Sequence, residues 1–172
     1  MKQTIKLFVI SILLLSFTSI FAQGRMGEVG KLFKKDEANK LFGNPKTTIE
    51  ISPKLLKVAL LKANDYILFT VKNGKVVLSD EKKHALTEDN VQLDRYEQSY
   101  IFSKSKVIEF LTAAFGNGSV QSAASMKDKA VEVLSSAVTS PIYVEVREST
   151  LTLTAADATL ELSTVCPPVC FE

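Results

Sequence analysis

The chain has little of what most enzymes use for chemistry. Its 172 residues include one histidine, two cysteines and no tryptophan. It contains no glycine-rich phosphate-binding loop, no dinucleotide fingerprint, no Gly-x-Ser-x-Gly elbow, no His-Glu-x-x-His pattern and no zinc-ligand spacing. The sequence therefore predicts no catalytic constellation and no resident cofactor.

Net charge is also missing from the part of the chain that we expect to fold. The sequence has 21 basic and 19 acidic residues, a formal net charge of +2. Lys2 and Lys6 make up this excess, and both lie in an N-terminal segment that we expect to be removed. Nucleic-acid-binding domains concentrate positive charge on one face. A nearly neutral mature chain therefore predicts no nucleic-acid partner.

Residues 1–22 have the three parts of a secretory signal peptide. The two lysines form the positive region, residues 7–15 form the apolar run, and Ile20–Ala22 form a cleavage site. The apolar run is shorter than the roughly 20 residues that a membrane-spanning helix needs. The sequence therefore predicts a secreted or periplasmic protein with no membrane span after cleavage, folded as a single domain over residues 23–172.

The clearest structural signal is a β-hairpin within residues 65–80. Asn73-Gly74 separates two apolar runs, and this pair is typical of a two-residue type I′ turn, which needs positive φ at both positions. Such a turn fixes the pairing of the apolar side chains that face the core, Val71 with Val76 and Phe69 with Leu78.

A second hairpin, over residues 141–154, repeats this plan. Its turn, Glu148-Ser149, is poor type I′ chemistry, so we expect a longer turn there. A strand, a serine that caps a helix, and that helix precede each hairpin, and the two capping serines are Ser52 and Ser103. This order predicts an α+β fold in which an antiparallel sheet carries helices on one face. It also predicts two diverged β-α-β-β halves, an internal repeat of residues 47–80 and 98–154.

Apolar spacing and capping residues predict four helices. Ser52 and Pro53 mark one helix start, because serine is a favoured N-cap and proline a favoured first residue. The other three are predicted over residues 29–42, 104–115 and 126–138.

A third strand is predicted to follow the second hairpin through a turn at Ala156-Asp157. This register places Leu160 opposite Leu153 and Leu162 opposite Leu151. Residues 158–163 would then form an exposed edge, to which a partner protein can add a strand.

The two cysteines lie in the C-terminal tail, as Cys166-Pro-Pro-Val-Cys170. In an exported protein the default is one disulfide within the chain. The prolines keep Cys166 and Pro167 extended, so the chain must reverse around Pro168-Val169 to close the ring. By loop entropy so small a ring contributes about 2 kcal/mol, which pins the terminus rather than holding the fold.

Three other chemistries are open to the same pair. A thiol-redox pair usually needs a helix N-terminus or a cation beside it, and two prolines disfavour that setting. The spacing resembles the copper-binding Cys-Pro-x-x-Cys-Pro motif of Sco-type proteins, which implies a soft-metal site at Cys166 and Cys170. The second proline and the histidine of that family are absent. The third possibility is an intermolecular disulfide.

The remaining polar and aromatic candidates are predicted to be structural. His84 lies in a charged loop and is expected to be solvated. The acidic residues around it have no EF-hand spacing; they are Asp80, Glu81, Glu88, Asp89 and Asp94. A strand over residues 95–102 would place Tyr96, Tyr100 and Phe102 on one face, which is more typical of core than of a ligand platform.

These observations favour a non-enzymatic binding or structural module of the cell envelope or extracellular space. Its partner, a protein or a small molecule, is not specified by the sequence. The alternative is a thiol-redox or soft-metal (copper) binding protein that acts through Cys166 and Cys170. Reactivity separates the two, because a structural disulfide resists mild reductant and a functional thiol pair does not.

Overall fold

A computed structural model describes residues 27–87, 93–94, 96–116, 140–148 and 150–166. The predicted signal peptide, the predicted helix over residues 126–138 and Cys170 lie outside the described residues, and these expectations stay predictions.

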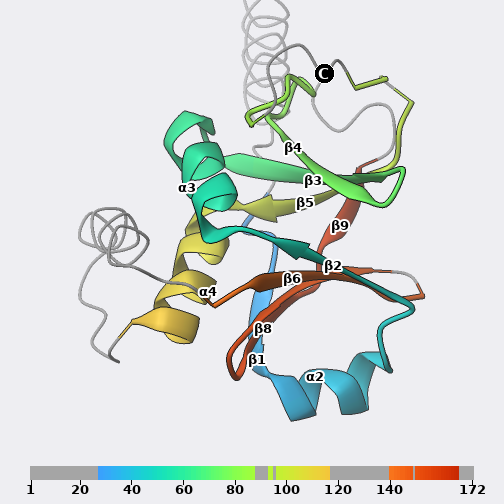
Figure 1. The fold of residues 1–172 in the computed structure, drawn as a ribbon, viewed down its shortest axis with the longest axis vertical. Coiled ribbons are helices and arrows are strands. Elements are labelled where there is room, and N and C mark those ends of the chain that lie inside the picture. The colour runs from blue at the N-terminus through green and yellow to red at the C-terminus, as the bar shows by residue number, and fades with distance from the viewer. Residues whose placement is uncertain (1–26, 88–92, 95, 117–139, 149, 167–172) are drawn as a thin grey trace, which may run out of the picture.

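The strands form two antiparallel sheets, which lie as two layers in Figure 1. The five-stranded sheet has the order β1 (Lys31–Lys34), β8 (Ala158–Glu161), β7 (Leu151–Ala155), β6 (Ile142–Val146) and β2 (Thr47–Ile51). The four-stranded sheet has the order β4 (Lys75–Ser79), β3 (Tyr66–Lys72), β5 (Ser99–Ser103) and β9 (Thr164–Cys166). The predicted α+β class with antiparallel strands is confirmed, but the strands divide between two sheets where the sequence predicted one.

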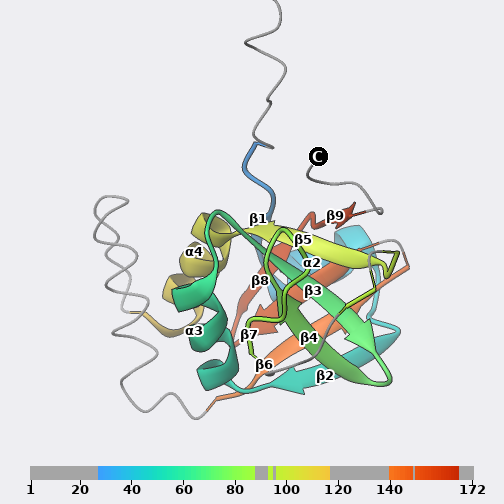
Figure 2. The same ribbon diagram turned by 90° about the horizontal axis from the view of Figure 1, so that it is seen from above.

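The described residues contain three helices: α2 (Lys35–Phe42), α3 (Pro53–Lys62) and α4 (Lys104–Phe115). Figures 1 and 2 show α3 and α4 side by side at one end of the two layers. In Figure 1, α2 lies apart from them, beneath the five-stranded sheet. The helices therefore do not all share one face.

Two serines precede the helices that the sequence predicted, and they act differently. Ser52 caps α3 as expected, since its hydroxyl accepts from the Leu55 amide at 3.2 Å and Pro53 follows it. The Ser103 hydroxyl makes no cap bond to α4. It accepts instead from the Val29 amide at 2.6 Å, while the Ser103 amide donates to the Val29 carbonyl. This pair of bonds joins the start of the described chain to the four-stranded sheet.

Each hairpin pairs with the strand that precedes the other hairpin. β2 leads through α3 into the β3–β4 hairpin, yet β2 pairs with β6 of the second hairpin. β5 leads through α4 towards the β6–β7 hairpin, yet β5 pairs with β3. The sheets thus contain two equivalent three-stranded units, β4-β3-β5 and β7-β6-β2.

The first hairpin has the predicted turn and register. The φ angles of Asn73 and Gly74 are 51° and 72°, as a type I′ turn requires. Val71 pairs with Val76, and in the second hairpin Val146 pairs with Leu151. The two hairpins therefore share the same register, but the second turn includes residue 149, which lies outside the described residues, so its greater length stays a prediction.

The third strand of the meander is shorter than predicted, and its edge is not free. Leu153 pairs with Leu160 as expected. Leu162 does not continue the strand, because its φ is 61° and its side chain is 47% exposed. The outer edge of β8 is covered by β1, so the predicted site for strand addition at residues 158–163 is wrong.

β1 is itself a departure from the predicted helix over residues 29–42. Only Lys35–Phe42 is helical, and Lys31–Lys34 pairs with β8, with Leu32 opposite Leu160. In this pairing Leu32 and Phe33 are half-buried and the two lysines are exposed, and an adjacent apolar pair of this kind is compatible with a helix or a strand. Gly43 ends the helix as predicted, with a φ of 77°.

The core lies between the two sheets and is closed at one end by α3 and α4. Both hairpins contribute their predicted apolar faces to it. Its largest fully buried side chains include Phe69, Phe102, Phe110, Ile142, Leu151 and Leu153. Of the predicted aromatic stripe, Phe102 lies in this core and Tyr100 packs against it, whereas Tyr96 precedes β5 and is 74% exposed.

We predict that Gly30→Ala lowers the free energy of unfolding by about 2 kcal/mol. The φ of Gly30 is 114°, and an added Cβ would lie 3.1 Å from Leu160 Cδ1 and 3.1 Å from Phe102 Cδ1. Gly27→Ala is the control, because nothing lies within 4 Å of a Cβ there. Urea denaturation of both variants measures the difference. Equal stabilities would contradict the close packing at Gly30.

Candidate functional site

Of the two cysteines predicted to carry chemistry, only Cys166 lies within the described residues. It is the last residue of β9, and the register places it opposite Ser99 at the edge of the four-stranded sheet. Because Cys170 lies outside the described residues, the structure does not test the disulfide between the two cysteines, which stays a prediction.

His84 lies on the surface beside a carboxylate. Its Nδ1 is 3.1 Å from Asp80 Oδ2, and its side chain is 72% exposed. The other Asp80 oxygen accepts from the backbone amides of Lys82 and His84. Asp80 therefore shapes this loop through main-chain contacts. The exposure of His84 agrees with the predicted solvated loop histidine.

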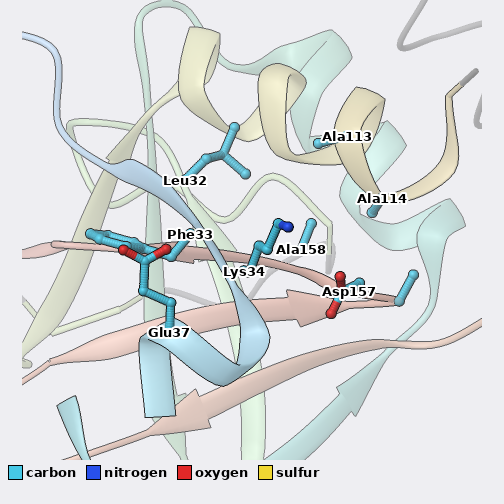
Figure 3. A pocket seen from close by; sticks show the side chains of 9 residues that line it. Leu32, Phe33, Lys34, Glu37, Ala113, Ala114, Asp157 and Ala158 are labelled. Atoms are coloured by element: carbon cyan, nitrogen blue, oxygen red, sulfur yellow. The ribbon is translucent and has the colours of Figure 1, made fainter. Parts of the chain in front are cut away.

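A groove of about 570 Å³ opens between β1, the start of α2 and the C-terminal end of α4 (Figure 3). We call it the α4 groove. Its apolar lining comes from β1, α4, the β7–β8 turn and β8. In that order the residues are Leu32, Phe33, Ala113, Ala114, Ala156 and Ala158. Figure 3 shows Leu32 pointing towards α4. Four alanines keep the groove wide, because a methyl group fills little of the space between the elements.

Three charged side chains complete the lining of the α4 groove. Lys34 ends β1, Glu37 lies in the first turn of α2, and Asp157 lies in the turn between β7 and β8. All three are exposed. The Lys35 amide donates to the Asp157 carbonyl at 3.1 Å, which holds the start of α2 beside this turn. The groove thus combines an apolar floor with charges of both signs at its rim.

The outer face of the five-stranded sheet, which α2 covers, carries a buried ionic cluster centred on Arg147. We call it the Arg147 cluster. Its members are Glu145 on β6, Arg147 just after β6, Thr152 on β7 and Glu161 on β8. Strand alternation places Glu145, Thr152 and Glu161 on the face opposite the core. The side chains of Arg147 and Glu161 are 1% and 0% exposed, because α2 covers this face.

The Arg147 guanidinium links both carboxylates to α2. Its Nη2 donates to Glu145 Oε2 at 2.9 Å and to Asn39 Oδ1 at 3.0 Å. Its Nη1 donates to the Gly43 carbonyl at the end of α2, where a cation is favoured by the helix dipole. Its Nε lies 3.2 Å from Glu161 Oε1. One arginine therefore joins β6, β8 and the C-terminal end of α2.

Glu161 is the least satisfied member of the Arg147 cluster. Neither of its carboxylate oxygens has a well-aligned hydrogen-bond partner among the described residues. Burial raises the pKa of Glu161 from 4.5 to about 7, the Arg147 guanidinium opposes this rise, and the Glu145 carboxylate adds to it. The amide of Leu162 opposes the rise only slightly. The Glu161 carboxyl group therefore gains or loses its proton near neutral pH. The Arg147 guanidinium is the one positive charge of the cluster, and it faces the carboxyl groups of both Glu145 and Glu161.

Sequence reasoning missed both the α4 groove and the Arg147 cluster. Alternation in the predicted strands would have placed Glu145 and Glu161 on one face, next to Thr152. No covering element was predicted for that face, which α2 buries in the structure. No sequence signal marks the groove, since its described lining combines four alanines with residues that are unremarkable in the sequence.

Comparisons with protein-family models, with curated proteins and with solved structures found no match to this chain. Within the described residues, no helix is both long and apolar enough to cross a membrane. Nor do three or more His, Cys, Asp or Glu side chains come together there in a group that would hold a metal ion.

We predict that Glu161 makes the protein more stable at pH 5 than at pH 8. Its folded-state pKa lies above its unfolded value of 4.5, so this contribution is complete below pH 4.5 and is lost as the pH rises through about 7. The expected loss is on the order of 2 kcal/mol, allowing for relaxation around the charge. Urea denaturation at both pH values measures it.

Glu161→Gln should remove this part of the pH dependence, because glutamine resembles the protonated carboxyl group. Glu50→Gln is the control, since Glu50 is an exposed glutamate on β2 of the same sheet. If Glu161→Gln and the parent chain lose the same stability between pH 5 and pH 8, Glu161 does not titrate in this range.

Proposed function

We propose that this chain is an exported, non-enzymatic binding protein whose ligand site is the α4 groove. The observation that supports this proposal is the groove itself, with a volume of about 570 Å³ and an apolar floor. Small-molecule sites usually occupy roughly 300–1,000 Å³ and combine apolar walls with a few polar groups. The groove is open to solvent, so its ligand keeps one side exposed.

The lining favours a small amphipathic ligand over a purely apolar one. Leu32, Phe33 and the alanines of α4 offer contacts to an apolar body. Lys34 at the rim attracts an anionic group, and Glu37 and Asp157 attract a cationic one. Both signs of charge within one groove suit a ligand with a charged end, such as an acylated amino acid or a short apolar peptide.

Binding fits the groove better than catalysis does. Among the described residues, its lining contains no histidine, cysteine or serine, and its three charged side chains are exposed. Nucleophilic catalysis needs a nucleophile within hydrogen-bond reach of a positioned base. Export to the cell envelope or beyond, which the N-terminal sequence predicts, is part of the same proposal.

The alternative function, thiol-redox or copper-binding chemistry at Cys166 and Cys170, rests on the sequence. The backbone position of Cys166, at the end of β9 on the edge of the four-stranded sheet, favours neither function. A direct measurement on the cysteines therefore separates the two functions.

We predict that Ala113→Arg weakens binding of the fluorescent probe 8-anilinonaphthalene-1-sulfonate at least fivefold. The probe has an apolar body and one sulfonate, and an arginine at position 113 would fill the groove wall on α4. Ala113 is exposed, so the fold should tolerate the change. Fluorescence titration gives the dissociation constant.

The matched control for this titration is Leu61→Arg. Leu61 is 56% exposed on α3 and does not line the groove, so this variant should bind the probe as the parent chain does. Equal affinities of Ala113→Arg and the parent chain, or no binding by the parent at millimolar probe, would contradict the groove as the ligand site.

We also predict that Cys166 and Cys170 form a metal-free disulfide in protein purified from its exported compartment. Intact mass should then show no alkylation before reduction, and replacing both cysteines by serine should cost about 2 kcal/mol of stability. Elemental analysis measures bound metal. Thiols that alkylate rapidly without reductant, or bound copper, would favour the alternative function.

A further inference from the structure

α2 is a helix with little stability of its own. It has eight residues, its N-cap residue Lys34 makes no side-chain cap bond, and Ala38 is its one buried residue. Isolated helices of this length are marginal in water, so α2 depends on its contacts with the five-stranded sheet. An element of this kind opens at lower free energy than the sheets do.

Contacts at both ends hold α2 on the sheet, and at its start the Lys35 amide donates to the Asp157 carbonyl at 3.1 Å. Phe42 packs edge-to-face on Phe33 of β1, with ring centroids 5.4 Å apart. At the C-terminal end, Arg147 donates to the Gly43 carbonyl and to Asn39. The guanidinium that fixes α2 is therefore the same group that faces the two buried carboxyl groups.

Among the described residues, Arg147 is the one charged side chain that forms an ion pair with the two carboxyl groups covered by α2. Lys31 pairs with Glu161 in the β1–β8 register, but it is exposed and its Nζ lies 5.2 Å from the centre of the Phe33 ring. β7 contributes only threonines to this face, Thr152 and Thr154. The charged residues of α2 are all exposed; they are Lys35, Asp36, Glu37 and Lys40. With both glutamates ionised, the covered site therefore has a net charge of −1.

We propose that α2 is a pH-sensitive latch, which lies on the five-stranded sheet while the Glu161 carboxyl group is protonated and detaches when that group ionises. An uncompensated charge in a dry site is costly, and water can reach it most readily where the cover is weakest. The helix that covers this site is α2, which is short and has no side-chain N-cap bond. Burial places the pKa of Glu161 at about 7, so the transition falls near neutral pH.

The absence of tryptophan from the chain allows a clean test. Phe42→Trp introduces a single reporter on α2, at the contact with Phe33. We expect its fluorescence emission to shift to longer wavelength as the pH rises from 5.5 to 8.5, with a midpoint near 7. Far-UV circular dichroism should keep its strand signal, because the sheets stay folded.

Two double variants identify the group that titrates. Phe42→Trp with Glu161→Gln should show no shift, and Phe42→Trp with Glu50→Gln should shift as Phe42→Trp alone does. A shift that persists in the Glu161→Gln background, no shift in any variant, or loss of the strand signal at the same pH would each overturn the latch.

A second measurement covers the case in which tryptophan does not fit at position 42. Hydrogen exchange of the amides of residues 35–42 in the parent chain, corrected for the intrinsic effect of pH, should be at least tenfold faster at pH 8 than at pH 6. Glu161→Gln should remove this difference. Equal corrected rates at both pH values would overturn the proposal.

Discussion

The fold depends on the reciprocal pairing of two strands. β2 pairs with β6 and β5 pairs with β3, so each sheet is built from parts of both predicted halves. Each hairpin is extended along one edge by the strand that precedes the other hairpin in the sequence. The apolar face of each sheet is covered by the opposite sheet. The two sheets then bury their inner faces against each other, with Phe69 and Phe102 on one side and Val144 and Leu153 on the other. This arrangement links the two halves in one cooperative core.

Arg147 has a different role from the apolar core. A buried ion pair is weak evidence for stability, because desolvation of the charges offsets much of their attraction. Replacement of such a group by an apolar one is often tolerated, whereas removal of one partner leaves a buried charge. The contacts of Arg147 with Asn39 and Gly43 suggest that this cluster specifies where α2 lies. Glu161, which lacks well-aligned partners, makes that position sensitive to protonation.

Local signals in the sequence predicted the parts of the fold that local physics determines. The positive φ values required by Asn73-Gly74 and the cap formed by Ser52 involve neighbouring residues, so both were predicted correctly. Alternation then gave the register of the hairpins. β1 was mispredicted because its strand conformation depends on β8, more than a hundred residues further along the chain. The role of the Ser103 hydroxyl was mispredicted for the same reason. It accepts a hydrogen bond from the amide of Val29, which is distant in the sequence, and it does not cap α4.

The α4 groove and the Arg147 cluster both lie beside elements that are not part of the repeated hairpin pattern. The equivalent units β4-β3-β5 and β7-β6-β2 account for six of the strands, and β1, α2, β8 and β9 are additions to them. Both the α4 groove and the Arg147 cluster form where β1, α2 and β8 meet the end of one unit. The groove uses Glu37 near the start of α2, and the cluster uses Asn39 and Gly43 near its end. The short helix α2 therefore borders the α4 groove with its first turn and covers the Arg147 cluster with its last turn. The cluster thus joins the two kinds of segment: Arg147 and Glu145 come from the paired unit, whereas Glu161 and the α2 groups that Arg147 contacts come from the additions to it.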